Sequence, residues 1–92
     1  MARLGGKSHP RDIAVRAAFA RVLLELRERR GMTQEVLGFE SGYHPKYIGL
    51  LERRKHTPTL TALIEISRAL GVTPSWLVDR VRKMLPQFKR TG

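Results

Sequence analysis

The stretch TQEVLGFESGYHPKYIGLLERRKHTP, residues 33–58, predicts two short helices joined by a tight turn. Thr33 precedes the first helix, where its hydroxyl can accept a hydrogen bond from a free backbone N–H. That helix should end near Ser41, because Gly42 can adopt the positive φ that reverses the chain. Pro45 suits the first position of the second helix, where no backbone N–H is needed. Two short helices around a turn that contains Gly form a helix-turn-helix unit.

The charge of the chain favours a polyanion as its partner. The 92 residues, enough for one domain, include 18 Lys and Arg against 8 Asp and Glu, for a formal net charge of +10. The isoelectric point is near 11.3. A strongly basic small domain has nucleic acid as its first expected partner. Together with the helix-turn-helix unit, the charge predicts binding to double-stranded DNA.

Other classes of protein fit the composition poorly. No apolar run approaches the length of a membrane span, and residues 1–12 lack the apolar core of a signal peptide, so we expect no membrane association and a cytoplasmic location. The chain has no Cys, and its three His are scattered without ligand spacing, so we expect no metal and no cofactor. We find no carboxylate cluster with metal-binding spacing and no nucleophile beside a base, and therefore expect no enzyme activity.

The spacing of apolar residues divides the chain into an arm, one domain and a tail. Residues 1–12 predict a flexible basic arm, which is either simply disordered or able to touch phosphates or a minor groove. Residues 13–85 predict an all-α domain with helices over 13–30, 33–41, 45–54, 59–70 and 74–85. Residues 86–92 predict a basic C-terminal tail.

Each predicted helix carries candidate core residues at helical spacing. They are Phe19, Val22, Leu23 and Leu26 in the first helix, Val36, Leu37 and Phe39 in the second, Tyr47, Ile48 and Leu51 in the third, Leu60, Leu63, Ile64, Ser67 and Leu70 in the fourth, and Trp76, Leu77, Val81 and Met84 in the last. Trp76 and Leu77 complete either the core or a dimer seam.

The third helix leaves Pro45, Lys46, Gly49, Leu50 and Arg53 toward the outside. Small and apolar groups there fit the floor of a DNA groove, where Leu50 can contact a thymine methyl; alternatively Leu50 is one more core residue. Lys46 can donate to guanine O6 or N7, or it serves as a phosphate clamp. Arg53, at the back of the helix, is better placed for the DNA backbone or for solvent.

Residues 19–77 resemble the Cro/C1-type (Xre-family) helix-turn-helix domain. The matching landmarks are Leu23, Leu26, Arg27, Gly31, Thr33, Gln34, Glu35, Leu37, Gly42, Tyr47, Ile48, Glu52, Arg53, Lys55, Pro58, Leu60, Leu63, Ala69, Leu70, Gly71, Val72 and Leu77. The resemblance implies a compact five-helix bundle of the lambda-repressor-like type, whose third helix enters the major groove. It also implies a small transcriptional regulator, expected to be a repressor that binds a two-fold symmetric operator as a homodimer.

The resemblance also implies roles for individual residues. Its phosphate-contacting positions fall on Gln34, His44, Lys55, His56 and Thr57. Its base-reading positions fall on Pro45, Lys46, Gly49 and Leu50, and its internal ion pair falls on Arg27 and Glu52. An antitoxin or another protein-interaction module on the same fold, with a toxin as a possible partner, is the alternative function.

This sequence departs from the family pattern at several positions. Arg54 stands where the family prefers Gly, so the third helix is expected to close differently or to run longer. Gly38 replaces the usual Ala, which should weaken the second helix by up to about 1 kcal/mol. Pro45, Gly49 and Leu50 have no side-chain donors for bases, which leaves Lys46 as the polar reader and predicts sparse direct readout.

Overall fold

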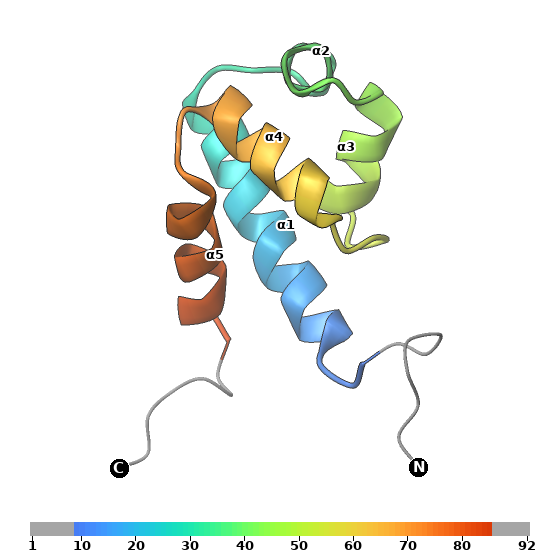
Figure 1. Cartoon of the computed structure of the whole chain (residues 1–92). Coiled ribbons are helices and arrows are strands. Elements are labelled where there is room, and N and C mark those ends of the chain that lie inside the picture. Colours follow the sequence, from blue (N-terminus) through green and yellow to red (C-terminus); the bar gives the residue numbers. More distant parts are fainter. Residues whose placement is uncertain (1–8, 86–92) are drawn as a thin grey trace.

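The structure, a computed structural model, describes residues 9–85. They form the helices α1 (Asp12–Arg29), α2 (Gln34–Ser41), α3 (Pro45–Glu52), α4 (Leu60–Leu70) and α5 (Pro74–Lys83) (Figure 1). The predicted all-α, five-helix class is therefore confirmed. Most of the predicted arm and the whole predicted tail lie outside the described residues.

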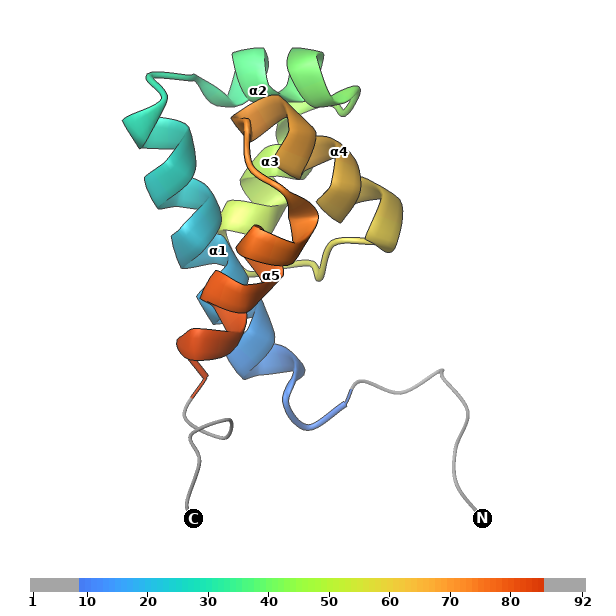
Figure 2. The same ribbon diagram turned by 60° about the vertical axis from the view of Figure 1, so that its left-hand side comes forward.

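The helices pack around α1 and α4. α1 contacts α3 and α5, α2 contacts α3 and α4, and α4 also contacts α5. α2 lies at one end of the domain, while the first and last described residues lie at the opposite end (Figures 1 and 2). No helix within residues 9–85 combines the length and the apolar character needed to cross a membrane.

Three threonines begin helices, in the way the sequence predicts for Thr33. The hydroxyls of Thr33, Thr59 and Thr73 accept hydrogen bonds from the N–H of the residue three positions later, at 3.0 to 3.1 Å. Each bond satisfies one of the free N–H groups of the first turn. Gly42 and Gly71 end α2 and α4 with φ values of 83° and 77°, a conformation that Gly adopts without steric cost.

The core contains most of the residues that the helical spacing selected. Fully buried side chains come from every helix: Leu23, Leu37, Ile48, Leu51, Ile66, Leu70 and Leu77. Ile66 was not among the predicted core residues. The core also contains Phe19, Val22, Leu26 and Val81. Two further predicted members, Tyr47 and Leu63, are half-buried at the edge of the core. α3 thus buries one face against α1 and α2, and α4 buries one face against α2 and α5.

Several predicted core residues are on the surface instead. Phe39 is 85% exposed and Leu60 is 73% exposed. α2 is covered on one side only, and Leu37, Gly38 and Ser41 occupy that side, so Phe39 faces solvent. Leu60 is the first residue of α4 and extends beyond the core. Other partly exposed members of the predicted core are Val36, Ile64, Trp76 and Met84.

α3 ends at Glu52, two residues before the predicted end. The N–H of Lys55 donates to the carbonyl of Leu50, and the N–H of Arg54 donates to that of Leu51. This pair of bonds is the Schellman closure, which requires a left-handed residue between helix and loop. Arg54 supplies it with φ 64°. The expectation of a different closure or a longer helix is wrong, because Arg54 adopts the conformation usually given to Gly.

Gly38 is a packing requirement rather than a weak point of α2. A Cβ atom built at Gly38 would lie 2.5 Å from the carbonyl oxygen of Tyr43 and 3.1 Å from the nitrogen of Pro45. Both neighbours are backbone atoms of the turn, which the N–H of Tyr43 ties back to the carbonyl of Gly38 at 2.8 Å. The absence of a side chain at Gly38 lets the turn lie directly on α2.

Candidate nucleic-acid interface

Arg27 of α1 and Glu52 of α3 form an ion pair inside the domain. Arg27 Nε lies 2.5 Å from Glu52 Oε2, and Nη2 donates to Oε1 at 3.1 Å. The side chains are 14% and 6% exposed. Arg27 Nη1 also donates to the carbonyl of Met32 at 2.8 Å. The hydrogen bond to Glu52 raises the pKa of Arg27, outweighing the opposite effect of burial. The pair therefore fixes the end of α3 against α1.

Gln34, the first residue of α2, joins the same carboxylate. Its Nε2 donates to Glu52 Oε1 at 2.9 Å, so the side chain turns toward α3. Glu52 attracts the Gln34 amide because a carboxylate accepts hydrogen bonds strongly. One Nε2 hydrogen and the carbonyl oxygen of Gln34 take no part in this bond. The bond therefore orients an amide at the start of α2 and leaves a donor for a further partner.

His44 caps α3 at its N-terminus. Its Nδ1 accepts a hydrogen bond from the N–H of Lys46 at 3.0 Å, and Pro45 occupies the first helical position. An Nδ1 that accepts must carry no proton, so the neutral ring has its proton on Nε2. His44 is an exposed residue, so that N–H can donate to a partner outside the chain. Lys46 follows on the surface.

Gly49 and Leu50 lie differently from the outward positions predicted for them. Gly49 is buried beneath the side chains of Gln34 and Arg53, which would meet an added Cβ atom. The expectation that Gly49 is exposed is wrong, because a position without a side chain is covered by its long neighbours. Leu50 is half-buried, so it is neither fully exposed, as a groove-facing residue would be, nor fully buried, as a core residue would be.

The loop after α3 is tied to α1 by a residue that the sequence did not indicate. Arg16 Nε donates to Thr57 Oγ1 at 3.0 Å. Lys55, His56 and Thr57 are all exposed, and the His56 ring lies 6.4 Å from the Tyr47 ring. Arg16 and Thr57 are 41 positions apart, so no local pattern could have revealed the contact.

The predicted site residues lie together on the α2–α3 unit and its following loop. Lys46, Arg53 and Lys55 are exposed cations, while the nearby carboxylate of Glu52 is neutralised by Arg27. The surface is positive, with donors from Gln34 and His44 beside the cations. Within the described part of the chain, no three His, Asp or Glu side chains are arranged to hold a metal ion. This arrangement can neutralise phosphates and place a helix against base edges.

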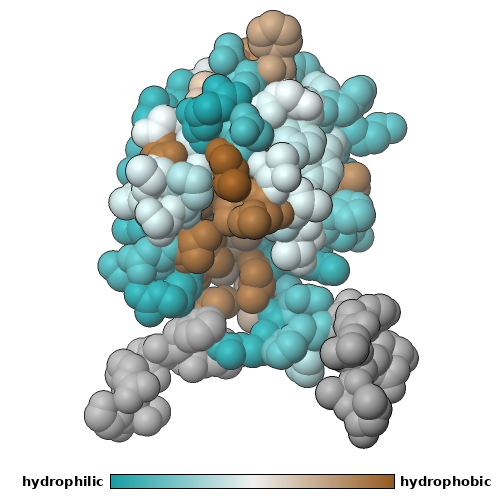
Figure 3. Space-filling view, viewed as in Figure 1, coloured by the Kyte–Doolittle hydropathy of each residue, from teal (hydrophilic) through white to brown (hydrophobic). Residues whose placement is uncertain are grey.

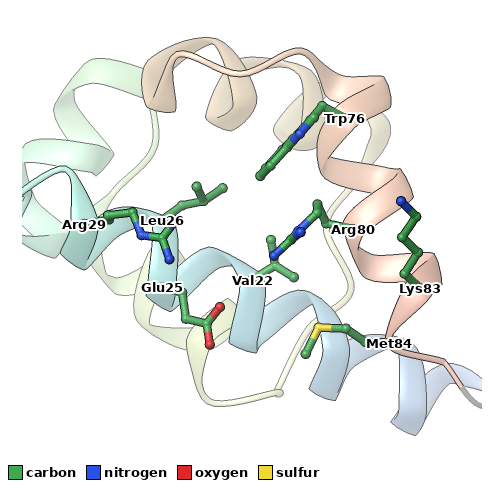
Figure 4. Close-up of a pocket in the computed structure, with 8 residues that line it drawn as sticks. All are labelled: Val22, Glu25, Leu26, Arg29, Trp76, Arg80, Lys83 and Met84. Carbon is green, nitrogen blue, oxygen red and sulfur yellow. The ribbon is translucent and has the colours of Figure 1, made fainter.

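A second concave region lies between α1 and α5, away from the α2–α3 unit (Figure 4). Its volume is about 230 Å³, and it is lined by Val22, Glu25, Leu26, Arg29, Trp76, Arg80, Lys83 and Met84. The Arg80 guanidinium lies 5.3 Å from the centre of the Trp76 ring. A cation over an indole face is a favourable contact, which holds the Trp76 side chain at the groove.

The five-helix fold and the basic surface of the α2–α3 unit together define a DNA-binding domain of the helix-turn-helix type. The sequence profile of the helix-turn-helix family matches residues 23–77, which include α2 and α3. The chain belongs to this family, in its Cro/C1-type branch of transcriptional regulators.

Known proteins with similar sequences or structures are regulators. The uncharacterized HTH-type transcriptional regulator y4dJ of Sinorhizobium fredii is 42% identical over 53 residues, 58% of this chain and 69% of y4dJ. The restriction-modification controller protein C.AhdI from Aeromonas hydrophila superposes with a TM-score of 0.67 and 34% identity, covering 70% of this chain and 97% of C.AhdI.

A third relative has been solved on DNA. The restriction-modification controller protein C.Esp1396I, a tetramer in complex with its natural 35 base-pair operator, matches with a TM-score of 0.70 and 27% identity, covering 77% of this chain and 93% of that protein. All three are regulators or controllers, which favours the regulatory function over the antitoxin alternative.

Proposed function

We propose that this protein is a repressor that binds a two-fold symmetric operator as a homodimer and inserts α3 into the major groove. The observation that carries the proposal is the network of Arg27, Glu52 and Gln34, which locks α1, α2 and α3 together beneath an exposed basic surface. A rigid scaffold of this kind holds a recognition helix in one orientation, as groove binding requires.

The exposed donors divide into two groups by position. Gln34 at the start of α2, His44 at the cap of α3, and Lys55, His56 and Thr57 in the loop flank α3 and contact phosphates. Lys46, in the first turn of α3, faces the base edges, and Leu50 offers methyl groups to thymine. Pro45, at the first position of α3, lies half-buried beside Lys46. Phosphate contacts set the register of the helix, whereas contacts to bases set the preferred sequence.

An apolar seam on α4 and α5 fits a second copy of the chain. The seam consists of Leu60, Leu63 and Ile64 on α4 and Val78 on α5, of which Ile64 is 42% and Val78 is 45% exposed. Beside it, Val15, Phe19, Leu63, Val78 and Val81 line a groove of about 180 Å³ together with Thr57 and Pro58. Hydrophobic residues gather on this face of the molecule (Figure 3). Exposed apolar clusters of this kind mark protein–protein interfaces.

A second copy is the occupant we propose, because a two-fold symmetric operator needs two recognition helices at matching half-sites. Two copies of α3 should meet half-sites about 10 base pairs, or about 34 Å, apart on one face of the duplex. The tetramer of C.Esp1396I on its operator supports binding as an assembly of copies.

Selection of bound sequences from random double-stranded DNA, read out by sequencing, tests the proposal. We expect an enriched motif of two inverted half-sites with centres about 10 base pairs apart. Sedimentation of the protein on the enriched duplex should give two copies per motif. Enrichment of no sequence, or a one-to-one complex on a single half-site, would contradict the proposal.

A further inference from the structure

Arg53 lies over Gly49 on α3, in a position that helix geometry explains. The two residues are four positions apart, so they occupy the same side of the helix on successive turns. Long side chains on a helix lean toward its N-terminus, which carries the Arg53 guanidinium back over Gly49. A Cβ atom at Gly49 would lie 3.0 Å from Arg53 Nη1, closer than ordinary contact. The missing side chain at Gly49 therefore creates the place that the guanidinium occupies.

The Arg53 guanidinium is not used by the rest of the domain. Arg53 is exposed, and its backbone N–H donates to the carbonyl of Gly49. Among the described residues, its side chain makes no hydrogen bond or ion pair. Two arginines of α1 differ, since Arg27 is bound to Glu52 and Arg16 is bound to Thr57. Arg53 thus keeps its full set of donors for a partner outside the chain.

Gln34 limits where this guanidinium can point. A Cβ atom at Gly49 would lie 3.4 Å from Gln34 Oε1, so the Gln34 amide borders the same space as Arg53 Nη1. Glu52 holds that amide by its Nε2. Gln34 and Arg53 therefore both border the space above Gly49, between the start of α2, where a phosphate contact is proposed, and the first turn of α3, where base contacts are proposed.

A guanidinium at this place has the shape that the remaining positions of α3 lack. Arg presents parallel donors that match O6 and N7 of guanine, whereas Lys46 offers a single charged point. Pro45, Gly49 and Leu50 offer no side-chain donor at all. The sequence assigned Arg53 to the backbone or solvent because position 53 is at the end of the helix. Because the Arg53 side chain extends back over Gly49, its guanidinium lies about one turn closer to the N-terminus of α3 than its own backbone does.

We propose that Arg53 reads a guanine in the major groove and that Gly49 is the positioning residue that permits it. The inference rests on the proposed DNA-binding function and specifies how a helix front poor in polar groups recognises sequence. Arg53→Lys keeps the positive charge and removes the parallel pair of N–H donors. Gly49→Ala keeps Arg53 and fills the space that its guanidinium occupies.

The experiment measures binding of the full chain to the selected duplex and to a scrambled duplex at several salt concentrations. We expect Arg53→Lys to lose about tenfold or more in affinity for the selected duplex, with little change on scrambled DNA and an unchanged salt slope. Gly49→Ala should fold normally by circular dichroism and lose a similar factor on the selected duplex. Arg80→Ala, which removes a cation on α5, is the control and should leave the preference intact.

Substitution of each guanine in the selected duplex by 7-deazaguanine identifies the base. This change removes N7 and leaves base pairing intact, so the parent protein should lose affinity at one guanine of each half-site. Arg53→Ala should be insensitive to the substitution at that guanine. Sensitivity that persists in Arg53→Ala, or an equal loss on selected and scrambled duplexes, would show a phosphate contact and overturn the inference. A parent protein with no preference for any duplex would instead overturn the proposed function as well.

Discussion

Arg27 donates two hydrogen bonds to Glu52, from Nε to Oε2 and from Nη2 to Oε1, and only 14% and 6% of the two side chains are exposed. Glu52 also accepts the Gln34 amide, so one carboxylate holds α1, α2 and α3 in a fixed arrangement. A buried carboxylate with both oxygens engaged stabilises this arrangement only while its partners remain.

Removal of one member of this pair should strongly destabilise the domain. Glu52→Ala leaves the Arg27 guanidinium uncompensated in a largely buried place, which costs about 3 to 5 kcal/mol and lowers the melting temperature by more than about 10 °C. The double variant Arg27→Met/Glu52→Leu should be more stable than Glu52→Ala, because it buries no unpaired charge. Thermal unfolding followed by circular dichroism measures both. A melting temperature of Glu52→Ala within a few degrees of the parent would contradict burial of the pair.

Gly38→Ala should destabilise the protein although alanine favours helices. Helix propensity alone predicts a gain of up to about 1 kcal/mol. The new Cβ would instead meet the carbonyl of Tyr43 and the nitrogen of Pro45, so we expect a net loss of about 1 to 3 kcal/mol from overpacking. Urea unfolding measures the free energy. Gly49→Ala is the matched control, because its Cβ meets only flexible side chains and should not destabilise.

Arg54→Gly should stabilise the end of α3. Arg54 has a φ of 64°, which costs a residue with a side chain about 1 to 2 kcal/mol. Glycine removes that cost but adds freedom to the unfolded chain, so the expected net gain is about 0.5 to 1 kcal/mol. Arg53→Gly provides the opposite sign, since φ there is −93° and glycine brings only the loss. Equal effects of the two variants on urea unfolding would contradict the role of backbone strain.

The apolar seam should control assembly and leave folding intact. Ile64→Glu or Val78→Glu places a charge where a second copy would cover it, so each should shift the protein toward monomers by sedimentation equilibrium. Both side chains are already partly in water, and the melting temperature should change by only a few degrees. Phe39→Glu is the control, because Phe39 is exposed on α2 outside the seam. Dimers that persist in both seam variants would place the interface elsewhere.

Lys55 and Lys46 should differ in how their loss affects binding. Phosphate contacts release counterions whatever the sequence, so Lys55→Ala should weaken selected and scrambled duplexes alike and reduce the salt slope of log K by about 0.9. Lys46→Ala should cost about 1 to 3 kcal/mol on the selected duplex and little on the scrambled one. Titrations at several salt concentrations compare them. An equal loss for Lys46→Ala on both duplexes would assign Lys46 to a phosphate.

The sequence by itself determined the features that depend on neighbours along the chain. The hydroxyls of Thr33, Thr59 and Thr73 accept hydrogen bonds from N–H groups only three residues later. The positive φ of Gly42 likewise depends only on the absence of its own side chain. The helical spacing of apolar residues also selected most of the core, because a helix in a small domain buries one face. The Arg27 and Glu52 pair was anticipated through resemblance, and the structure brings these two residues together.

Only the tertiary structure decided features that depend on how the helices cross. The exposure of Phe39 follows from cover on just one side of α2, and the need for Gly38 follows from the close approach of the turn. The direction of Gln34 depends on Glu52, 18 positions away. Arg53 occupies the space above Gly49 beside an amide that belongs to α2. A sequence pattern specifies which face of a helix is apolar, but the separation between atoms of different helices is set by packing of the whole core.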